Sequence, residues 1–294
     1  MLLKSLIQLL RPEQWIKNGF IFLPIFFSGQ VLNTTMQLSC LVAFIAFSLA
    51  ASSIYCFNDI HDVALDKLHP IKCKRPIASG AISIKTAYAV MLTCLALSML
   101  ILFCFKGIHQ DNIMSLIAIY YIMNIAYCIR LKRYVFIDVI VISIGFVLRI
   151  FVGGIATDVW LSEWIVIMTF LLALFLAFAK RRDDVIIYQE TTVSHRKHIN
   201  RYNLEFINQV MTLVSTITIV AYLMYTISSD VIERFHSRYI YFTTIFVLVG
   251  IIRYLQVTII DLKSGSPTKI LLTDRVIQFC IIGWIISFII IIYL

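Results

Sequence analysis

The chain has 294 residues, of which 61% are hydrophobic and only 14% are charged. Roughly a quarter of the residues of a soluble domain are charged, so this composition excludes an ordinary soluble protein. The formal net charge of +9 would suit a nucleic-acid partner. However, apolar runs of about 20 residues recur along the chain, and each is long enough to cross a bilayer. We therefore predict an all-α, polytopic membrane protein that binds no nucleic acid, with its basic residues distributed by membrane topology.

Nine apolar segments are predicted to be transmembrane helices. They are residues 14–31, 38–57, 84–105, 112–129, 135–156, 162–179, 206–227, 239–260 and 272–293. The first is the least regular, because Lys17, Asn18 and Pro24 interrupt it. Of the 25 Lys and Arg residues, 20 fall near the N-terminus or after the even-numbered segments. The positive-inside rule then predicts a multi-pass protein of the cell inner (cytoplasmic) membrane, with its N-terminus in the cytoplasm and its C-terminus outside.

A dense acidic run directly follows the second apolar segment. It contains Asn58, Asp59, Asp62 and Asp66, and a basic loop with Arg75 comes next. At helical spacing, Asn58, Asp62 and Asp66 are predicted to share one face, with Asp59 beside them. Like charges at this spacing repel unless a cation lies between them, and Mg²⁺ prefers carboxylate oxygens. We predict that these four residues hold Mg²⁺ next to a phosphorylated substrate. The alternative is a solvated helix end, which would not explain so many acids in so apolar a chain.

Basic side chains on the same predicted face could bind the phosphates of a substrate. They are Lys17, Arg75, Lys132, Lys180 and Arg181. Arginine presents a planar fork to phosphate, and lysine presents a point charge. The alternative is that these residues reflect only the positive-inside bias, which would leave the adjacent acids unexplained.

Arg149 lies inside the fifth predicted span. An arginine at this depth is costly and normally faces the protein interior or a polar cavity, so we predict that it binds substrate or supports the site. Snorkelling toward the membrane surface is the alternative. Gly153 and Gly154 follow it, and we predict that they serve helix packing rather than a phosphate cradle.

The acidic run and several other motifs resemble the UbiA-type intramembrane prenyltransferases. Asn58-Asp59-x-x-Asp62-x-x-x-Asp66, followed by Arg75-Pro76-Ile77-Ala78-Ser79-Gly80, is similar to the first aspartate-rich motif of that family. Arg11-Pro12-x-Gln14-Trp15-x-Lys17-Asn18 and Tyr127-x-x-Arg130-Leu131-Lys132 are similar to its decaprenyl-phosphate phosphoribosyltransferase branch. The resemblance covers nearly the whole chain. It implies one domain over residues 1–294, with nine transmembrane helices around a polar cavity open to the cytoplasm.

The resemblance also implies an activity. In the place of the second DxxxD of typical prenyltransferases, the chain has Lys180-Arg181-Arg182-Asp183-Asp184, a poorer metal site and a better anion site. The branch then implies phosphoribosyl diphosphate as donor, a polyprenyl phosphate in the bilayer as acceptor, and Mg²⁺ as cofactor. Asn58, Asp62 and Asp66 would be the catalytic residues. Transfer of an isoprenyl group to an aromatic acceptor and transport of an anionic metabolite remain alternatives, and a homo-oligomer is left open.

Overall fold

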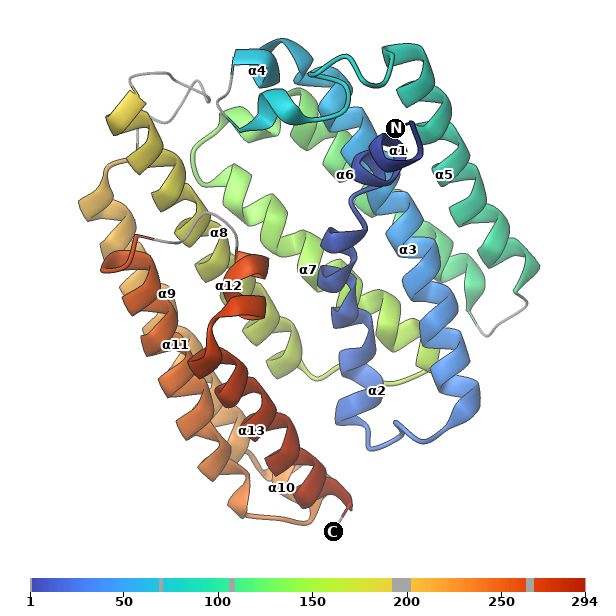
Figure 1. The fold of residues 1–294 in the computed structure, drawn as a ribbon. Helices are drawn as coiled ribbons and strands as arrows, with labels where there is room; N and C mark the ends of the chain where they lie inside the picture. The colour runs from blue at the N-terminus through green and yellow to red at the C-terminus, as the bar shows by residue number, and fades with distance from the viewer. Residues whose placement is uncertain (1, 69–70, 106–108, 192–201, 263–266, 294) are drawn as a thin grey trace. The chain divides into compact units, whose positions relative to one another are not determined.

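The computed structural model describes residues 2–68, 71–105, 109–191, 202–262 and 267–293, and this part of the chain contains helices and no strands. Contacts divide the chain into two compact units, Met1–Leu161 and Ser162–Leu294 (Figure 1). This agrees with the all-α class predicted from composition. Each unit is described by itself below.

The described part of the first unit contains ten helical segments, three of them 3₁₀ helices. They are α1 (Leu2–Leu10), η1 (Pro12–Phe22), α2 (Leu23–Phe27), α3 (Thr34–His61), α4 (Val63–Leu68), η2 (Lys72–Lys74), α5 (Ile84–Cys104), α6 (Gln110–Ile129), η3 (Leu131–Arg133) and α7 (Ile137–Thr157).

The second unit is built mainly from long helices joined by short ones. Its described segments are α8 (Glu163–Thr191), α9 (Leu204–Ile227), α10 (Ser229–Phe235), η5 (Tyr239–Thr243), α11 (Thr244–Ile259), α12 (Pro267–Thr273) and α13 (Arg275–Tyr293).

Seven helices among the described residues are long and apolar enough to cross a membrane, and there are eight if α12 and α13 form one span bent by 81°. Seven of the predicted spans coincide with these seven helices, and the ninth, 272–293, falls on the bent pair. The first predicted span, 14–31, is not one α-helix. It consists of η1 and the short α2, whose second residue is Pro24. The prediction of nine spans therefore remains a prediction.

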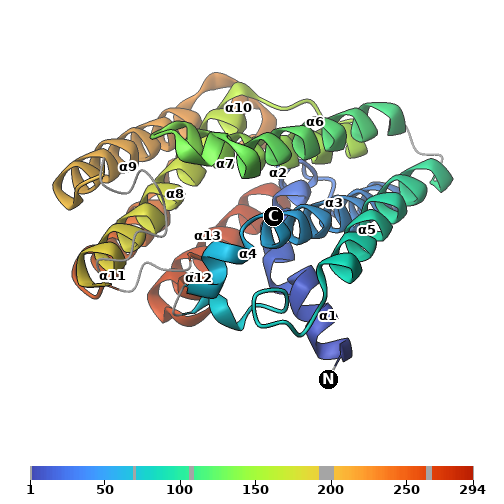
Figure 2. The ribbon, with the colours of Figure 1, turned by 90° about the horizontal axis from the view of Figure 1, so that it is seen from above.

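Helix α3 is the centre of the first unit and contacts α1, η1, α5, α6 and α7. Figure 2 shows α3 and α5 running side by side. Many of the buried residues of α3 are small, among them Ala46, Ala50, Ser48, Ser52 and Ser53. Small side chains let neighbouring helices approach closely, and in a membrane this close packing replaces the hydrophobic driving force between helices.

The 3₁₀ helix η1 packs along α3 in a fixed register. Trp15 Nε1 donates to Ser52 Oγ at 3.0 Å, and Asn18 Nδ2 donates to Ser48 Oγ at 2.8 Å. Three residues of a 3₁₀ helix rise about 6 Å, and four residues of an α-helix also rise about 6 Å. The two helices run antiparallel, and each step of three residues along η1 matches a step of four residues along α3. This match explains a 3₁₀ helix of 11 residues, whereas most end after three or four.

The three-residue period gives η1 three distinct faces. Trp15 and Asn18 lie on the face toward α3, whereas Ile16, on a second face, is 47% exposed. The third face carries Gln14, Lys17 and Phe20, all half-buried, and the half-buried Arg11 directly precedes η1. A polar strip thus runs along η1 beside its contact with α3.

Gly153 on α7 lets η1 approach closely. A Cβ atom at this position would lie 2.0 Å from the carbonyl oxygen of Ile21. Because that oxygen belongs to the backbone, no side-chain rotation can relieve the clash. The prediction that Gly153 and Gly154 serve packing is confirmed, since a Cβ at Gly154 would also be tight against Leu161, at 3.0 Å.

We expect Gly153→Ala to destabilise the first unit by about 3 kcal/mol, because α7 and η1 must separate to admit the methyl group. Gly19→Ala is the matched control, since a Cβ there meets nothing within 4 Å. Thermal unfolding of the detergent-purified variants measures the difference. Equal midpoints for the two variants would contradict the close contact.

In the second unit, the side chain of Arg182 on α8 forms hydrogen bonds to α9 and α11. Its Nε donates to Asn208 Oδ1 at 2.8 Å, and its Nη1 donates to the carbonyl oxygen of Thr258 at 2.7 Å. The side chain is 5% exposed. These bonds give Arg182 a structural role in joining α8, α9 and α11.

Candidate functional site

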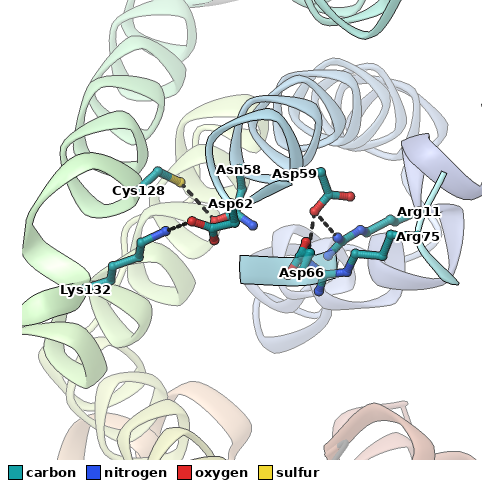
Figure 3. Close-up of polar contacts among 8 residues, drawn as sticks. All are labelled: Arg11, Asn58, Asp59, Asp62, Asp66, Arg75, Cys128 and Lys132. Carbon is teal, nitrogen blue, oxygen red and sulfur yellow. Dashed lines mark hydrogen bonds and ion pairs between the residues drawn. The ribbon is translucent and has the colours of Figure 1, made fainter. Parts of the chain in front are cut away.

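The acidic run lies where α3 ends and α4 begins. Helix α3 ends at His61, Asp62 leaves helical geometry (φ −94°, ψ 5°), and α4 starts at Val63. Figure 3 shows the polar side chains around this break in two sets. One set is Asn58 and Asp62 with groups from α6 and η3, and the other is Asp59 and Asp66 with two arginines.

Asp59 and Asp66 share cations across two helical turns. Arg75 Nη1 lies 3.1 Å from Asp59 Oδ1 and 2.7 Å from Asp66 Oδ2. Arg11 Nη2 lies 2.5 Å from the same Asp59 oxygen. The Asp59 side chain is 1% exposed, and a carboxylate buried this far needs such partners to stay charged. Arg75 therefore lies where sequence analysis placed a phosphate-binding cation, but here it neutralises acids.

Asn58 and Asp62 form the second set. Lys132 Nζ lies 2.5 Å from Asp62 Oδ1, and the Cys128 thiol donates to Asn58 Oδ1 at 3.5 Å. The predicted stack of Asn58, Asp62 and Asp66 is divided between the two sets, because Asp66 shares Arg75 with Asp59 whereas Asp62 pairs with Lys132. The three carboxylates therefore have different cations: Asp59 and Asp66 have Arg11 and Arg75, and Asp62 has Lys132.

The donor set suits a hard cation such as Mg²⁺. The described contacts engage one oxygen of each carboxylate, namely Asp59 Oδ1, Asp62 Oδ1 and Asp66 Oδ2. Asp59 Oδ2 is buried and has no hydrogen-bond partner among the described residues. Orphaned buried oxygens are rare and call for a water or an ion. Within the same residues, however, no three His, Cys, Asp or Glu side chains lie close enough together to hold one metal ion.

Burial raises the pKa of Asp66, while the charge and hydrogen bond of Arg75 oppose the rise. A carboxyl with a raised pKa binds its proton more tightly in the folded state. Its ionised form therefore depends on Arg75, and acidification toward the raised pKa would neutralise Asp66 before an ordinary aspartate.

Arg11 is a site residue that the prediction of substrate-binding residues missed. It connects α1 to η1 in the left-handed region, with φ 52° and ψ 58°. Its guanidinium also lies 5.2 Å from the centre of the Tyr55 ring. Such backbone strain in a non-glycine residue is often retained at functional sites. The sequence signal was present, because Arg11 begins the motif that includes Lys17.

Arg149 is 5% exposed and held by neutral groups. Its Nε donates to Asn18 Oδ1 at 2.7 Å, its Nη1 to the Gly145 carbonyl oxygen at 2.6 Å, and its Nη2 to Tyr120 Oη at 3.3 Å. The guanidinium also lies 4.8 Å from the Phe47 ring centre. Arg149 faces the interior of the unit, so the snorkelling alternative is wrong.

The remaining predicted cations, which are Lys17, Lys180 and Arg181, are distant from the acidic run in the sequence. Lys17 is half-buried on the polar strip of η1. Lys180 and Arg181 belong to α8 in the second unit, where Lys180 is exposed and Arg181 Nη1 pairs with Asp184 at 2.7 Å. Arg181 is 1% exposed, so its phosphate-binding role remains a prediction.

Arg253 lies on α11, inside the predicted span 239–260, and is paired in the second unit. Its Nη2 lies 2.9 Å from Asp274 Oδ2. Asp274 Oδ1 accepts hydrogen bonds from the backbone N–H groups of Val276 and Ile277 and so caps the start of α13. The pair stabilises the bend between α12 and α13.

The fold and the site define a polytopic helical membrane protein with paired carboxylates and cations at one end of its central helix. Residues 20–272 match the UbiA prenyltransferase family. The chain therefore belongs to the UbiA prenyltransferase family.

Curated relatives match almost the whole chain. The decaprenyl-phosphate phosphoribosyltransferase of Mycolicibacterium smegmatis is 32% identical, and the match covers 97% of this chain and 91% of the relative. The protein of the same name from Corynebacterium glutamicum is 28% identical, with 99% and 87% covered.

Solved structures of the family share the fold. A UbiA homolog from Archaeoglobus fulgidus, bound to GPP and Mg²⁺, aligns with a TM-score of 0.71 at 17% identity, covering 99% of this chain and 100% of that one. The apo UbiA homolog from Aeropyrum pernix K1 aligns with a TM-score of 0.68 at 15% identity, covering 94% and 98%.

The burial of Asp59 makes it the structural member of the acidic run. We expect Asp59→Asn to lower the free energy of unfolding by about 2 kcal/mol, because two half-buried arginines lose their shared counter-charge. Asp62→Asn should lower it by less than about 1 kcal/mol, because Asp62 and Lys132 are more exposed. Thermal melts of both purified variants test this order, and the reverse order would refute it.

Proposed function

We propose that this protein transfers 5-phosphoribose from phosphoribosyl diphosphate to a polyprenyl phosphate and releases diphosphate. The observation that carries the proposal is the carboxylate and cation cluster around the α3–α4 break, in a chain similar over nearly its whole length to phosphoribosyltransferases of that name. A diphosphate with its metal requires both kinds of group in one place.

The donor would bind at this break. Asn58, Asp59, Asp62 and Asp66 would hold Mg²⁺ together with the donor's phosphate oxygens, through the carboxylate oxygens that Arg75 and Lys132 leave unengaged, because no three acids of the described residues lie close enough to hold the ion alone. A divalent cofactor is supported by the solved UbiA homolog that is bound to GPP and Mg²⁺. Mg²⁺, when bound, neutralises negative charge on a departing diphosphate. Arg75 and Lys132 are already beside the acids and would transfer part of their hydrogen bonding to the donor's phosphates.

The acceptor needs no general base. A phosphate monoester has a second pKa of about 6 and is already anionic near neutral pH. Its oxygen would form the new bond to the anomeric carbon of the ribose while the bond to diphosphate breaks. The residues of the site would position the two reactants and stabilise charge on the leaving group, which are the sources of rate that this transfer at the anomeric carbon requires.

The membrane setting completes the proposal. The reaction would take place at the cytoplasmic face of the inner membrane, because the acidic run and most basic residues fall on the side that the positive-inside rule assigns to the cytoplasm. One UbiA-type domain with nine spans around a polar cavity would place a soluble donor and a lipid acceptor on the same site.

A reconstituted assay tests the activity. Purified protein with Mg²⁺, phosphoribosyl diphosphate and a polyprenyl phosphate should yield a phosphoribosylated lipid, detected by mass spectrometry. We expect Asp62→Asn to lower the rate about 100-fold, because a metal ligand and charge stabiliser is lost. Chelation with EDTA should abolish the product, and added Mg²⁺ should restore it.

Asp111→Asn is the control for the loss of one carboxylate. Asp111 is exposed in the first turn of α6, at the opposite end of that helix from Cys128, and its substitution should leave the rate unchanged. Full activity of Asp62→Asn would exclude the metal role. Transfer of an isoprenyl group to an aromatic acceptor, without phosphoribosyl transfer, would refute the proposed function.

A further inference from the structure

The polar strip of η1 carries charge that the acidic run does not neutralise. Lys17 lies on this strip, six residues after Arg11, which directly precedes η1. Arg11 is paired with Asp59. Lys17 has no ion pair or hydrogen bond among the described contacts, although its side chain is only partly exposed. The next residue, Asn18, accepts a hydrogen bond from Arg149 at 2.7 Å, so the positive charges of Lys17 and Arg149 come together at this point of η1.

Arg149 does not relieve the imbalance. All its described acceptors are neutral: an amide, a backbone carbonyl and a phenol. A buried cation without an anion is strongly unfavourable, and like charges beside each other add to the cost. Lys17 and Arg149 therefore bring two uncompensated positive charges into one part of the first unit, and an anionic ligand would stabilise both.

The position of Lys17 separates it from the donor site. Pro12, the residue after Arg11, begins η1, and five residues of a 3₁₀ helix rise about 10 Å, so the backbone of Lys17 lies about this far along η1 from Pro12. Its neighbours Trp15 and Asn18 bond to Ser52 and Ser48, which places Lys17 roughly two to three turns of α3 before Asn58. On the adjacent face of η1, Ile16 is 47% exposed, and a lipid chain could pack against it.

We propose that Lys17, supported by Arg149, binds the phosphate of the lipid acceptor rather than the donor. This inference rests on the proposed function and assigns a second anion subsite to it. Arg75 and Lys132, which pair with the acids, are left to the donor. Arg149 is a positioning residue. Its hydrogen bonds to Asn18 and Gly145 fix the guanidinium next to η1, where its positive charge attracts the ligand without contacting it.

Separate measurement of the two Michaelis constants tests the subsite. Lys17→Met keeps the length of the side chain and removes its charge. We expect it to raise KM for the polyprenyl phosphate about tenfold or more, because a charge-assisted hydrogen bond is lost, and to leave KM for phosphoribosyl diphosphate unchanged. Lys17→Arg should recover most of the acceptor affinity. Lys85→Met, at an exposed position of α5, is the matched control.

Two kinetic outcomes would overturn the inference. A rise only in the donor KM would place Lys17 on the donor's phosphates, and no change in either constant would remove it from both sites. Thermal melts of each variant show whether the protein is folded, and Lys17→Arg provides a charged variant if Lys17→Met is unstable.

A binding measurement separates this inference from the proposed function. In calorimetry without donor, the wild-type protein should bind farnesyl phosphate more tightly than farnesol, and Lys17→Met should lose this preference while Lys85→Met keeps it. If the wild-type protein shows this preference but transfers no phosphoribose, the proposed function fails and the subsite stands. If phosphoribose is transferred but Lys17→Met retains the preference, the subsite is wrong.

Discussion

The match in rise between a 3₁₀ helix and an α-helix is the constraint on which the first unit depends. Because three residues of η1 and four of α3 cover the same distance, Trp15 and Asn18 can bond to serines one α-turn apart. The same register orients Asn18 toward Arg149 and holds Arg11 next to Asp59. A regular α-helix in this place would rotate its side chains by a different angle per residue, and the polar strip would not form.

Charge in the first unit is balanced unevenly. Near the α3–α4 break, three carboxylates meet Arg11, Arg75 and Lys132, so the acids are neutralised before any substrate binds. Such internal pairing lowers the repulsion between acids that a metal would otherwise have to relieve. Farther along η1 the balance is positive. The anionic donor and the anionic acceptor would then bind different cations, the donor at the α3–α4 break and the acceptor at η1. Separate cations keep the two sets of phosphates apart until the reactants meet.

The basic run on α8 shows that neighbouring cations in a sequence can have different roles. Arg182 joins α8 to α9 and α11, Arg181 pairs with Asp184, and Lys180 is exposed. An acidic pair beside these residues is already engaged in part by arginine. This arrangement agrees with the absence of a second DxxxD in the chain and makes the α3–α4 break the main carboxylate site in the described part of the protein.

The amino-acid sequence by itself determined the helical membrane class, most of the spans, the acidic run and the packing role of Gly153, because these depend on local composition and spacing. Only the tertiary structure decided which acid pairs with which cation, since Arg11 and Asp59 are 48 residues apart and Lys132 and Asp62 are 70 apart. The tertiary structure also revealed η1. An apolar segment with polar interruptions does not show whether its helical period is 3.0 or 3.6 residues per turn, and here the hydrogen bonds to α3 select 3.0.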